Sequence, residues 1–217
     1  MSDALSAARP KSKRERTRDG LVAAAEELFS VSGPDAVSID EITALADVAK
    51  GTFYTHFADK DDIERTIAAA VRKELEAEVG RTNAGIEDAA VRMANGLATY
   101  LSFAVRQPVR ARTLLRLLSG AADPEKPINS GLRADVVRGV NDKRFDVVSI
   151  NGAVLTGLGA CVGGIAYLVQ TPKARAERTA AELIATVLRG FGVKAAESKK
   201  LAEAAAASAF AKGGTGK

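Results

Sequence analysis

One short polar face near residue 50 carries the side chains best suited to binding chemistry. Residues 50–57 read Lys-Gly-Thr-Phe-Tyr-Thr-His-Phe. In a helix that turns about 100° per residue, Gly51 and Thr55 point away from Phe53 and Phe57. The residues that flank this exposed line are Lys50, Thr52, Tyr54 and His56. Such donors can bond phosphates and base edges, and a glycine allows close approach of a ligand.

The elements around this face predict a helix-turn-helix. Ser38 followed by Glu41 has the spacing of a capping box, so we expect a helix over residues 39–46. Residues 47–49 are too few for a separate element, and the second helix follows over 50–57. A helix of this length fits the DNA major groove, and the second helix is the expected reader.

Two residues in this region have competing interpretations. His56, the single histidine, is either a solvated surface side chain or a phosphate donor on the reader helix. A catalytic base would need a nucleophile within reach, and Cys161 lies in a different predicted domain. Tyr54 could be a core aromatic residue, but its angle beside Thr55 favours a DNA contact. We therefore expect no enzyme, no metal site and no cofactor.

Composition predicts an all-α fold. The 217 residues are 47% hydrophobic, contain no Trp and show no sustained alternation of apolar and polar residues. The lone Cys161 excludes an intramolecular disulfide. The polar, basic N-terminus has no apolar run and is not a secretory signal, so a cytoplasmic protein is expected.

Charge is distributed unevenly along the chain. The net charge of +4 says little, and residues 1–60 carry eight Lys/Arg against ten Asp/Glu, a net of −2. A basic cluster precedes the helix-turn-helix and consists of Arg9, Lys11, Lys13, Arg14, Arg16 and Arg18. It is either a solubilising tail or an arm that touches DNA, and the neighbouring helix-turn-helix favours the arm. DNA affinity must then come from local placement of charge.

The chain divides into four predicted parts. Residues 1–12 form a flexible basic arm, and 13–60 a three-helix DNA-binding domain. Residues 61–193 form a larger helical domain for ligand binding and dimerisation, and 194–217 an Ala/Lys/Gly-rich tail that is partly disordered and partly a frayed helix. Further helices outside the helix-turn-helix are expected over 13–31, 60–82, 86–106, 110–118 and 131–141.

Residues 147–169 contain no charged side chain and allow three interpretations. The stretch is long enough to span a bilayer. Its glycines faintly resemble a phosphate-binding loop, but their spacing is wrong for the dinucleotide fingerprint. Five glycines with Asn151 and Thr156 lower its hydrophobicity, so a helix buried on most sides is favoured. The alternative function is a membrane-attached all-helical protein with 147–169 as its span.

A second apolar helix over residues 172–191 follows, with Gly192 as its C-terminal stop. Two consecutive apolar helices are more than one small domain needs to cover itself. We therefore expect a homodimer through the helices at about 147–170 and 172–191.

The sequence resembles the TetR family of bacterial transcriptional repressors. The residues that carry the resemblance are Ser38-Ile39-Asp40-Glu41-Ile42, Lys50 to Phe57, Asp59-Lys60 and Ile63. The resemblance covers about a quarter of the chain; beyond it only the helix count and a closing Leu188-Arg189-Gly190-Phe191-Gly192 match. It implies a repressor that binds a near-palindromic operator in double-stranded DNA as a homodimer and is released by a small molecule.

The resemblance also implies roles for particular residues. Phosphate contacts are implied for Ser38, Tyr54, His56 and Lys60. Groove contacts are implied for Lys50, Gly51, Thr52 and Thr55. The chain departs from the family pattern at Asp47, where glycine is usual, and at Ala49, where a hydroxyl residue is common.

The effector cannot be identified from these residues. Candidates to line its pocket are Met93, Leu97, Tyr100, Phe103, Leu117 and Asn151, each of which could equally fill a core. The long apolar helix offers no acid, which disfavours a multiply cationic effector.

Overall fold

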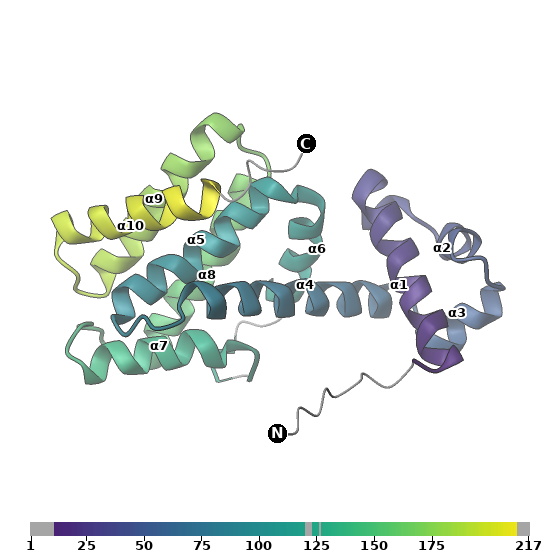
Figure 1. Cartoon of the computed structure of the whole chain (residues 1–217), viewed down its shortest axis with the longest axis horizontal. Coiled ribbons are helices and arrows are strands. Elements are labelled where there is room, and N and C mark those ends of the chain that lie inside the picture. The colour runs from purple at the N-terminus through teal and green to yellow at the C-terminus, as the bar shows by residue number, and fades with distance from the viewer. Residues whose placement is uncertain (1–10, 120–122, 126, 212–217) are drawn as a thin grey trace, which may run out of the picture. The chain divides into compact units, whose positions relative to one another are not determined.

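A computed structural model describes residues 11–119, 123–125 and 127–211, and over these ranges the regular structure is helical, without a strand (Figure 1). The first helices are α1 (Lys13–Ser32), η1 (Pro34–Ala36), α2 (Ile39–Leu45), α3 (Lys50–His56) and α4 (Lys60–Thr82). They are followed by α5 (Ala89–Arg106), α6 (Pro108–Ser119), η2 (Pro127–Asn129), α7 (Ser130–Asn141), α8 (Ile150–Leu168), α9 (Lys173–Gly190) and α10 (Ala195–Ala211). The all-α fold class is confirmed.

Two compact units divide the chain, Met1–Ile67 and Ala68–Lys217. The division falls within α4, so one helix begins in the first unit and ends in the second. The division lies a few residues beyond the expected one at 60/61.

The first unit has a core in which the two helices of the helix-turn-helix meet α1. Leu21, Ile42, Phe53 and Ile63 are fully buried. The capping box at Ser38 is present, which starts α2 at the expected residue. These apolar residues recur at helical spacing, so burial of one face of each helix fixes how α1, α2 and α3 pack.

The turn between α2 and α3 depends on Asp47, whose φ of 53° places it in the left-handed region. Aspartate tolerates this conformation, so the turn forms without the usual glycine, as expected. Val48 N–H closes the turn by donating to the Thr43 carbonyl over 3.0 Å. Ala49 supplies no side-chain cap to α3 and is exposed, although its spacing from Phe53 predicted a packed position.

The second unit is built around α5, which packs against α6, α7, α8, α9 and α10. Met93, Leu97 and Leu101 of α5 are buried. Helix α8 has the length and composition of a membrane span but packs on α5, α6, α7 and α9. Only 39% of its apolar window is buried, so α8 packs within the second unit but is less covered than the expected helix buried on most sides.

The C-terminal segment differs from the expected frayed helix. Residues 195–211 form α10, which packs on α5 and α9 with Ser198, Ala202 and Ala206 fully buried. Small residues at helical spacing let α10 lie close to its neighbours, a contact that the Ala-rich composition alone did not predict. Residues 212–217 lie outside the described residues.

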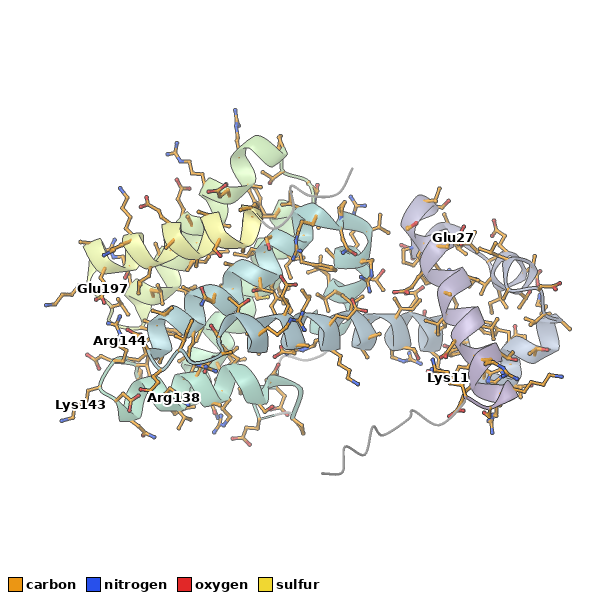
Figure 2. The ribbon with its side chains drawn as sticks, in the orientation of Figure 1. Lys11, Glu27, Arg138, Lys143, Arg144 and Glu197 are labelled. Carbon is orange, nitrogen blue, oxygen red and sulfur yellow. The ribbon has the colours of Figure 1, made fainter. Side chains whose placement is uncertain are left out.

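An arginine joins three segments at one end of the second unit. Arg144 lies between α7 and α8, and its guanidinium bonds Glu197 of α10 over 2.7 Å and Asp88 over 3.0 Å (Figure 2). These bonds raise the pKa of Arg144, with Glu197 as the larger cause. The cluster anchors the start of α10 to the N-terminal end of α5.

Candidate functional site

The outer face of α3 is exposed as the sequence predicts. Phe53 is 0% exposed, whereas the adjacent Tyr54 is 53% exposed. Lys50, Gly51 and Thr55 are exposed as well. Thr52 and His56 are half-buried at the edge of the face. An ideal Cβ at Gly51 would meet no atom within 4 Å, so this position is open to an approaching surface.

Several of these side chains already have partners within the domain. Lys50 Nζ lies 2.7 Å from Asp40 Oδ1, and this hydrogen bond and the charge of Asp40 raise the pKa of Lys50. Thr55 Oγ1 donates to the Gly51 carbonyl over 3.1 Å. Both residues remain exposed, and an exposed ion pair is weak, so a DNA group can compete for them.

Ser38 caps α2 with both its side chain and its backbone. Its hydroxyl donates to Glu41 Oε2 over 2.7 Å and accepts from the Glu41 amide over 3.2 Å. These bonds, with the backbone bond from Ser38 N–H, lower the pKa of Glu41. The serine that is expected to meet a phosphate is therefore also the residue that starts the helix.

Lys60 has a structural role that its sequence position did not reveal. Its ammonium donates to the carbonyls of Pro34 (2.9 Å) and Val37 (3.2 Å), which ties η1 to the start of α4. An ammonium has three donors, so one N–H remains for a phosphate.

The basic cluster before the helix-turn-helix is only partly free. Arg9 lies outside the described residues. Lys11 Nζ lies 2.6 Å from Asp19 Oδ2. The Arg18 guanidinium donates to Thr66 Oγ1 and stacks over the Phe57 ring at 4.9 Å, so it serves the packing of the first unit. The remaining members, which are exposed, are Lys13, Arg14 and Arg16.

The second unit contains a cavity of about 270 Å³ walled by α4, α5, α7 and α8. Its polar lining comes mainly from α4 and α5. The Tyr100 hydroxyl donates to Glu76 Oε1 over 2.6 Å, and Arg72 Nη2 lies 3.7 Å from the same oxygen. Burial and the charge of Glu76 raise the pKa of Tyr100, which keeps its hydroxyl protonated.

A second ion pair lies on the cavity wall. Arg92 Nε donates to Asp135 Oδ1 over 2.6 Å, and its Nη1 donates to the carbonyls of Asn83 and Ile86. Cys161 lines the same cavity, and burial raises the pKa of its thiol to about 12. A neutral thiol is a poor nucleophile, so Cys161 acts here as a small apolar wall residue.

Half of the predicted pocket residues line the cavity. Met93, Leu97 and Tyr100 do so. Phe103 is buried in the core and is not part of the cavity wall. Asn151 is exposed, bonds Arg133 over 2.6 Å and is not part of this wall either. The side chain of Leu117 lies outside the described residues.

Sequence reasoning missed the charged cavity residues Arg72, Glu76 and Asp135. Arg72 and Glu76 are four apart on α4, a spacing that is typical of an exposed salt bridge. Arg72 is in fact buried and Glu76 keeps 42% of its side chain exposed, so the spacing carries no signal that both residues line a cavity.

Helix α8 also presents an uncovered apolar face. Leu155 is 45% exposed and Tyr167 is 61% exposed. Between them, Gly159 and Gly163 are exposed and have open space where a Cβ would lie. This face could accept a second helix at close range.

The site therefore belongs to a helix-turn-helix protein with an internal cavity in a separate helical unit. Residues 21–65 match the family model described as "Bacterial regulatory proteins, tetR family". The chain is 36% identical over 64 residues to the HTH-type transcriptional repressor BepR of Brucella suis biovar 1 (strain 1330). The matched residues make up 30% of this chain and 31% of BepR. The chain thus matches less than a third of the length of this curated relative.

Two solved structures share the fold of nearly the whole chain. RolR in complex with the ligand resorcinol has a TM-score of 0.65 at 24% identity, covering 88% of this chain and 94% of RolR. CprB of Streptomyces coelicolor in complex with its biological operator sequence has a TM-score of 0.59 at 24% identity, covering 90% of this chain and 98% of CprB. The resemblance to the TetR family is confirmed: the chain carries the N-terminal domain of this family and the fold of its regulators.

Proposed function

We propose that this chain is a DNA-binding transcriptional regulator of the cytoplasm, a repressor that a small molecule releases from its operator. The observation that carries the proposal is the face of α3, where the exposed Lys50, Tyr54 and Thr55 lie on either side of the fully buried Phe53 in the sequence. A helix held by its apolar side and bare on its polar side suits insertion into a major groove. The operator complex of CprB and the resorcinol complex of RolR support DNA and a small molecule as the two ligands.

DNA contacts divide by chemistry. We assign phosphate contacts to Ser38, Tyr54, His56 and Lys60, whose hydroxyl, imidazole and ammonium groups can donate to phosphate oxygens. Groove contacts are assigned to Lys50, Gly51, Thr52 and Thr55. Phosphate contacts fix the register of the helix on the duplex, and groove contacts provide sequence preference.

Helix α4 supplies the route from effector to DNA. It runs unbroken from Lys60 to Thr82, and its second half contributes Arg72, Glu76 and Val79 to the cavity wall. An effector that fits the cavity in only one position of α4 shifts the population toward that position. In a dimer this changes the separation of the two reader helices, which then no longer fit half-sites about one helical turn or more apart.

The dimer is assigned to α8 and α9. The exposed Leu155 and Tyr167 of α8 would be covered by a second copy of the chain, and the glycines between them would allow close helix approach. A symmetric dimer places two copies of α3 on a near-palindromic operator. Catalysis forms no part of the proposal, because the proposal rests on binding groups and not on a nucleophile paired with a general base.

Fluorescence anisotropy with a duplex from the region upstream of the chain's own coding sequence tests the proposal. We expect salt-sensitive binding to this duplex and weaker binding to a scrambled duplex of the same composition. Lys50→Ala should weaken binding, whereas the charge-matched Lys200→Ala on the exposed face of α10 should not. Equal affinity for both duplexes would refute sequence-specific regulation.

A further inference from the structure

The cavity in the second unit has apolar walls and one polar corner. Its apolar side chains are Val79, Met93, Leu97, Leu132 and Leu158. The polar corner is formed by Glu76 and Tyr100, joined by the 2.6 Å hydrogen bond. A ligand must therefore present a mainly apolar surface and one suitably placed polar group.

Charges around the cavity balance. Arg72 faces Glu76, and Arg92 faces Asp135, so each guanidinium already has a carboxylate beside it. A charged ligand would lose its hydration on entry and would meet as much like charge as opposite charge. The lining consequently favours an uncharged ligand.

The polar corner contains a strong hydrogen-bond acceptor, the Glu76 carboxylate, with the Arg72 guanidinium 3.7 Å from its Oε1. The Tyr100 hydroxyl gives its single proton to Glu76 Oε1, and a carboxylate can accept about four hydrogen bonds in all. The second oxygen, Oε2, faces Gly131, where an added Cβ would lie only 3.3 Å away. Glycine at this position leaves room around Oε2, so a ligand group that donates to it has the best fit.

The volume bounds the size of the ligand. An apolar cavity of about 150 Å³ holds benzene, so at the same packing the present cavity holds about eleven non-hydrogen atoms. Four helices wall the cavity, and its limited volume favours a compact ligand over an extended chain.

The geometry points to an effector that is an uncharged, compact, mainly apolar alcohol or phenol, whose hydroxyl donates to Glu76. The inference rests on the proposed function, because it names the class of molecule that releases the repressor. Tyr100 is a positioning residue in this site: its hydroxyl bond holds one carboxylate oxygen of Glu76 and directs the other toward the ligand.

Four probes that share the naphthalene ring system test the chemical class by isothermal titration calorimetry on the full chain. They are β-naphthol, its methyl ether, β-naphthoate and unsubstituted naphthalene. We expect β-naphthol to bind at least tenfold more tightly than the methyl ether, because a donor to a carboxylate makes a strong hydrogen bond and an ether cannot donate. Naphthoate should bind more weakly than β-naphthol, because its charge finds no excess of positive charge in the cavity.

Variants then test the named atom. Glu76→Gln should reduce the preference for β-naphthol over naphthalene to within about threefold, because the acceptor loses its charge. Tyr100→Phe should reduce the same preference while leaving naphthalene affinity nearly unchanged. Glu74→Gln is the matched control on the same helix: Glu74 is exposed and pairs with Arg110 away from the cavity lining. The Glu74→Gln protein should prefer β-naphthol over naphthalene as strongly as the unaltered chain does.

Operator binding is measured on the same samples. The inference would be overturned if naphthoate or the methyl ether bound more strongly than β-naphthol. It would also be overturned if β-naphthol did not bind at millimolar concentration, or if Glu76→Gln kept the full preference for β-naphthol over naphthalene. If the protein still binds its operator in those cases, the proposed regulator function stands. If it binds β-naphthol but no operator, the ligand class stands and the proposed function fails.

Discussion

Adjacent residues of α3 should respond in opposite ways to substitution. Phe53 is fully buried between α3 and the rest of the first unit, whereas the Tyr54 hydroxyl lies on the exposed face. We predict that Tyr54→Phe abolishes most DNA affinity without loss of stability. Phe53→Ala should instead unfold the first unit and lose DNA binding as a consequence.

The magnitudes follow from burial and from the charge of the partner. A hydroxyl bond to a phosphate contributes about 1.5 kcal/mol, and a homodimer makes the contact twice, so Tyr54→Phe should cost about 3 kcal/mol of binding, roughly a hundredfold in Kd. Stability should change by less than about 0.5 kcal/mol, because the ring and its edge contact with Phe53 remain. Phe53→Ala leaves a cavity and should cost about 3–5 kcal/mol of unfolding free energy.

Fluorescence anisotropy at several salt concentrations and circular dichroism melts measure the two effects. The slope of log K against log salt should be unchanged in Tyr54→Phe, because a neutral donor releases no counterions. Full DNA affinity in Tyr54→Phe would refute the assigned contact. A Phe53→Ala protein as stable as the original chain would refute the packing of α3.

Three further predictions concern the second unit. Gly164→Ala should cost about 1–3 kcal/mol of stability, seen as a lower Tm, because its Cβ would lie 2.5 Å from Leu101 and 2.7 Å from Leu183. Leu155→Glu should convert the dimer to a monomer in sedimentation velocity, because it places charge in the proposed interface. The Cys161 pKa, raised to about 12 in the folded chain from an ordinary 9.0, predicts that unfolding free energy falls as pH rises above about 9. In that range the unfolded thiol releases its proton while the folded thiol keeps it, and urea titrations at pH 8 and 10 measure the difference.

Matched variants separate these effects from general damage. Gly20→Ala has open space at its Cβ and should not lower the Tm. Val31→Glu changes an 83% exposed residue of α1 and should leave the oligomeric state unchanged. Cys161→Ser should remove the thiol's share of the pH dependence. A Leu155→Glu protein that remains dimeric would move the interface away from this face of α8.

Lys60 shows why a contact assigned from sequence position needs the fold for its full meaning. Its place after the reader helix suggests a phosphate, and the structure adds two carbonyl acceptors from η1 and the residue after it. Both carbonyls lie more than twenty residues earlier in the chain, so no local pattern could reveal them. A substitution of Lys60 should therefore lower stability as well as DNA affinity.

Local interactions explain why so much of the first unit was predictable. A capping box acts between residues three apart, a left-handed aspartate acts within one residue, and the burial of Phe53 follows from helical spacing. Each of these features depends on residues that are close together in the sequence. The exposed face of α3 is predictable for the same reason, since the polar residues opposite Phe53 and Phe57 remain on the surface.

Tertiary packing decided the rest. Arg72 and Glu76 have the spacing of an exposed pair, and only the tertiary structure brings them to a cavity that Tyr100 of α5 also lines. The same packing excludes Phe103 from the cavity wall and turns the Ala-rich C-terminal segment into α10. The sequence by itself determined most of the helices, their apolar faces and the exposed polar face of α3, because these depend on periodicity within a few turns. The cavity depends on which helices meet, and that is a property of distances between residues far apart in the chain.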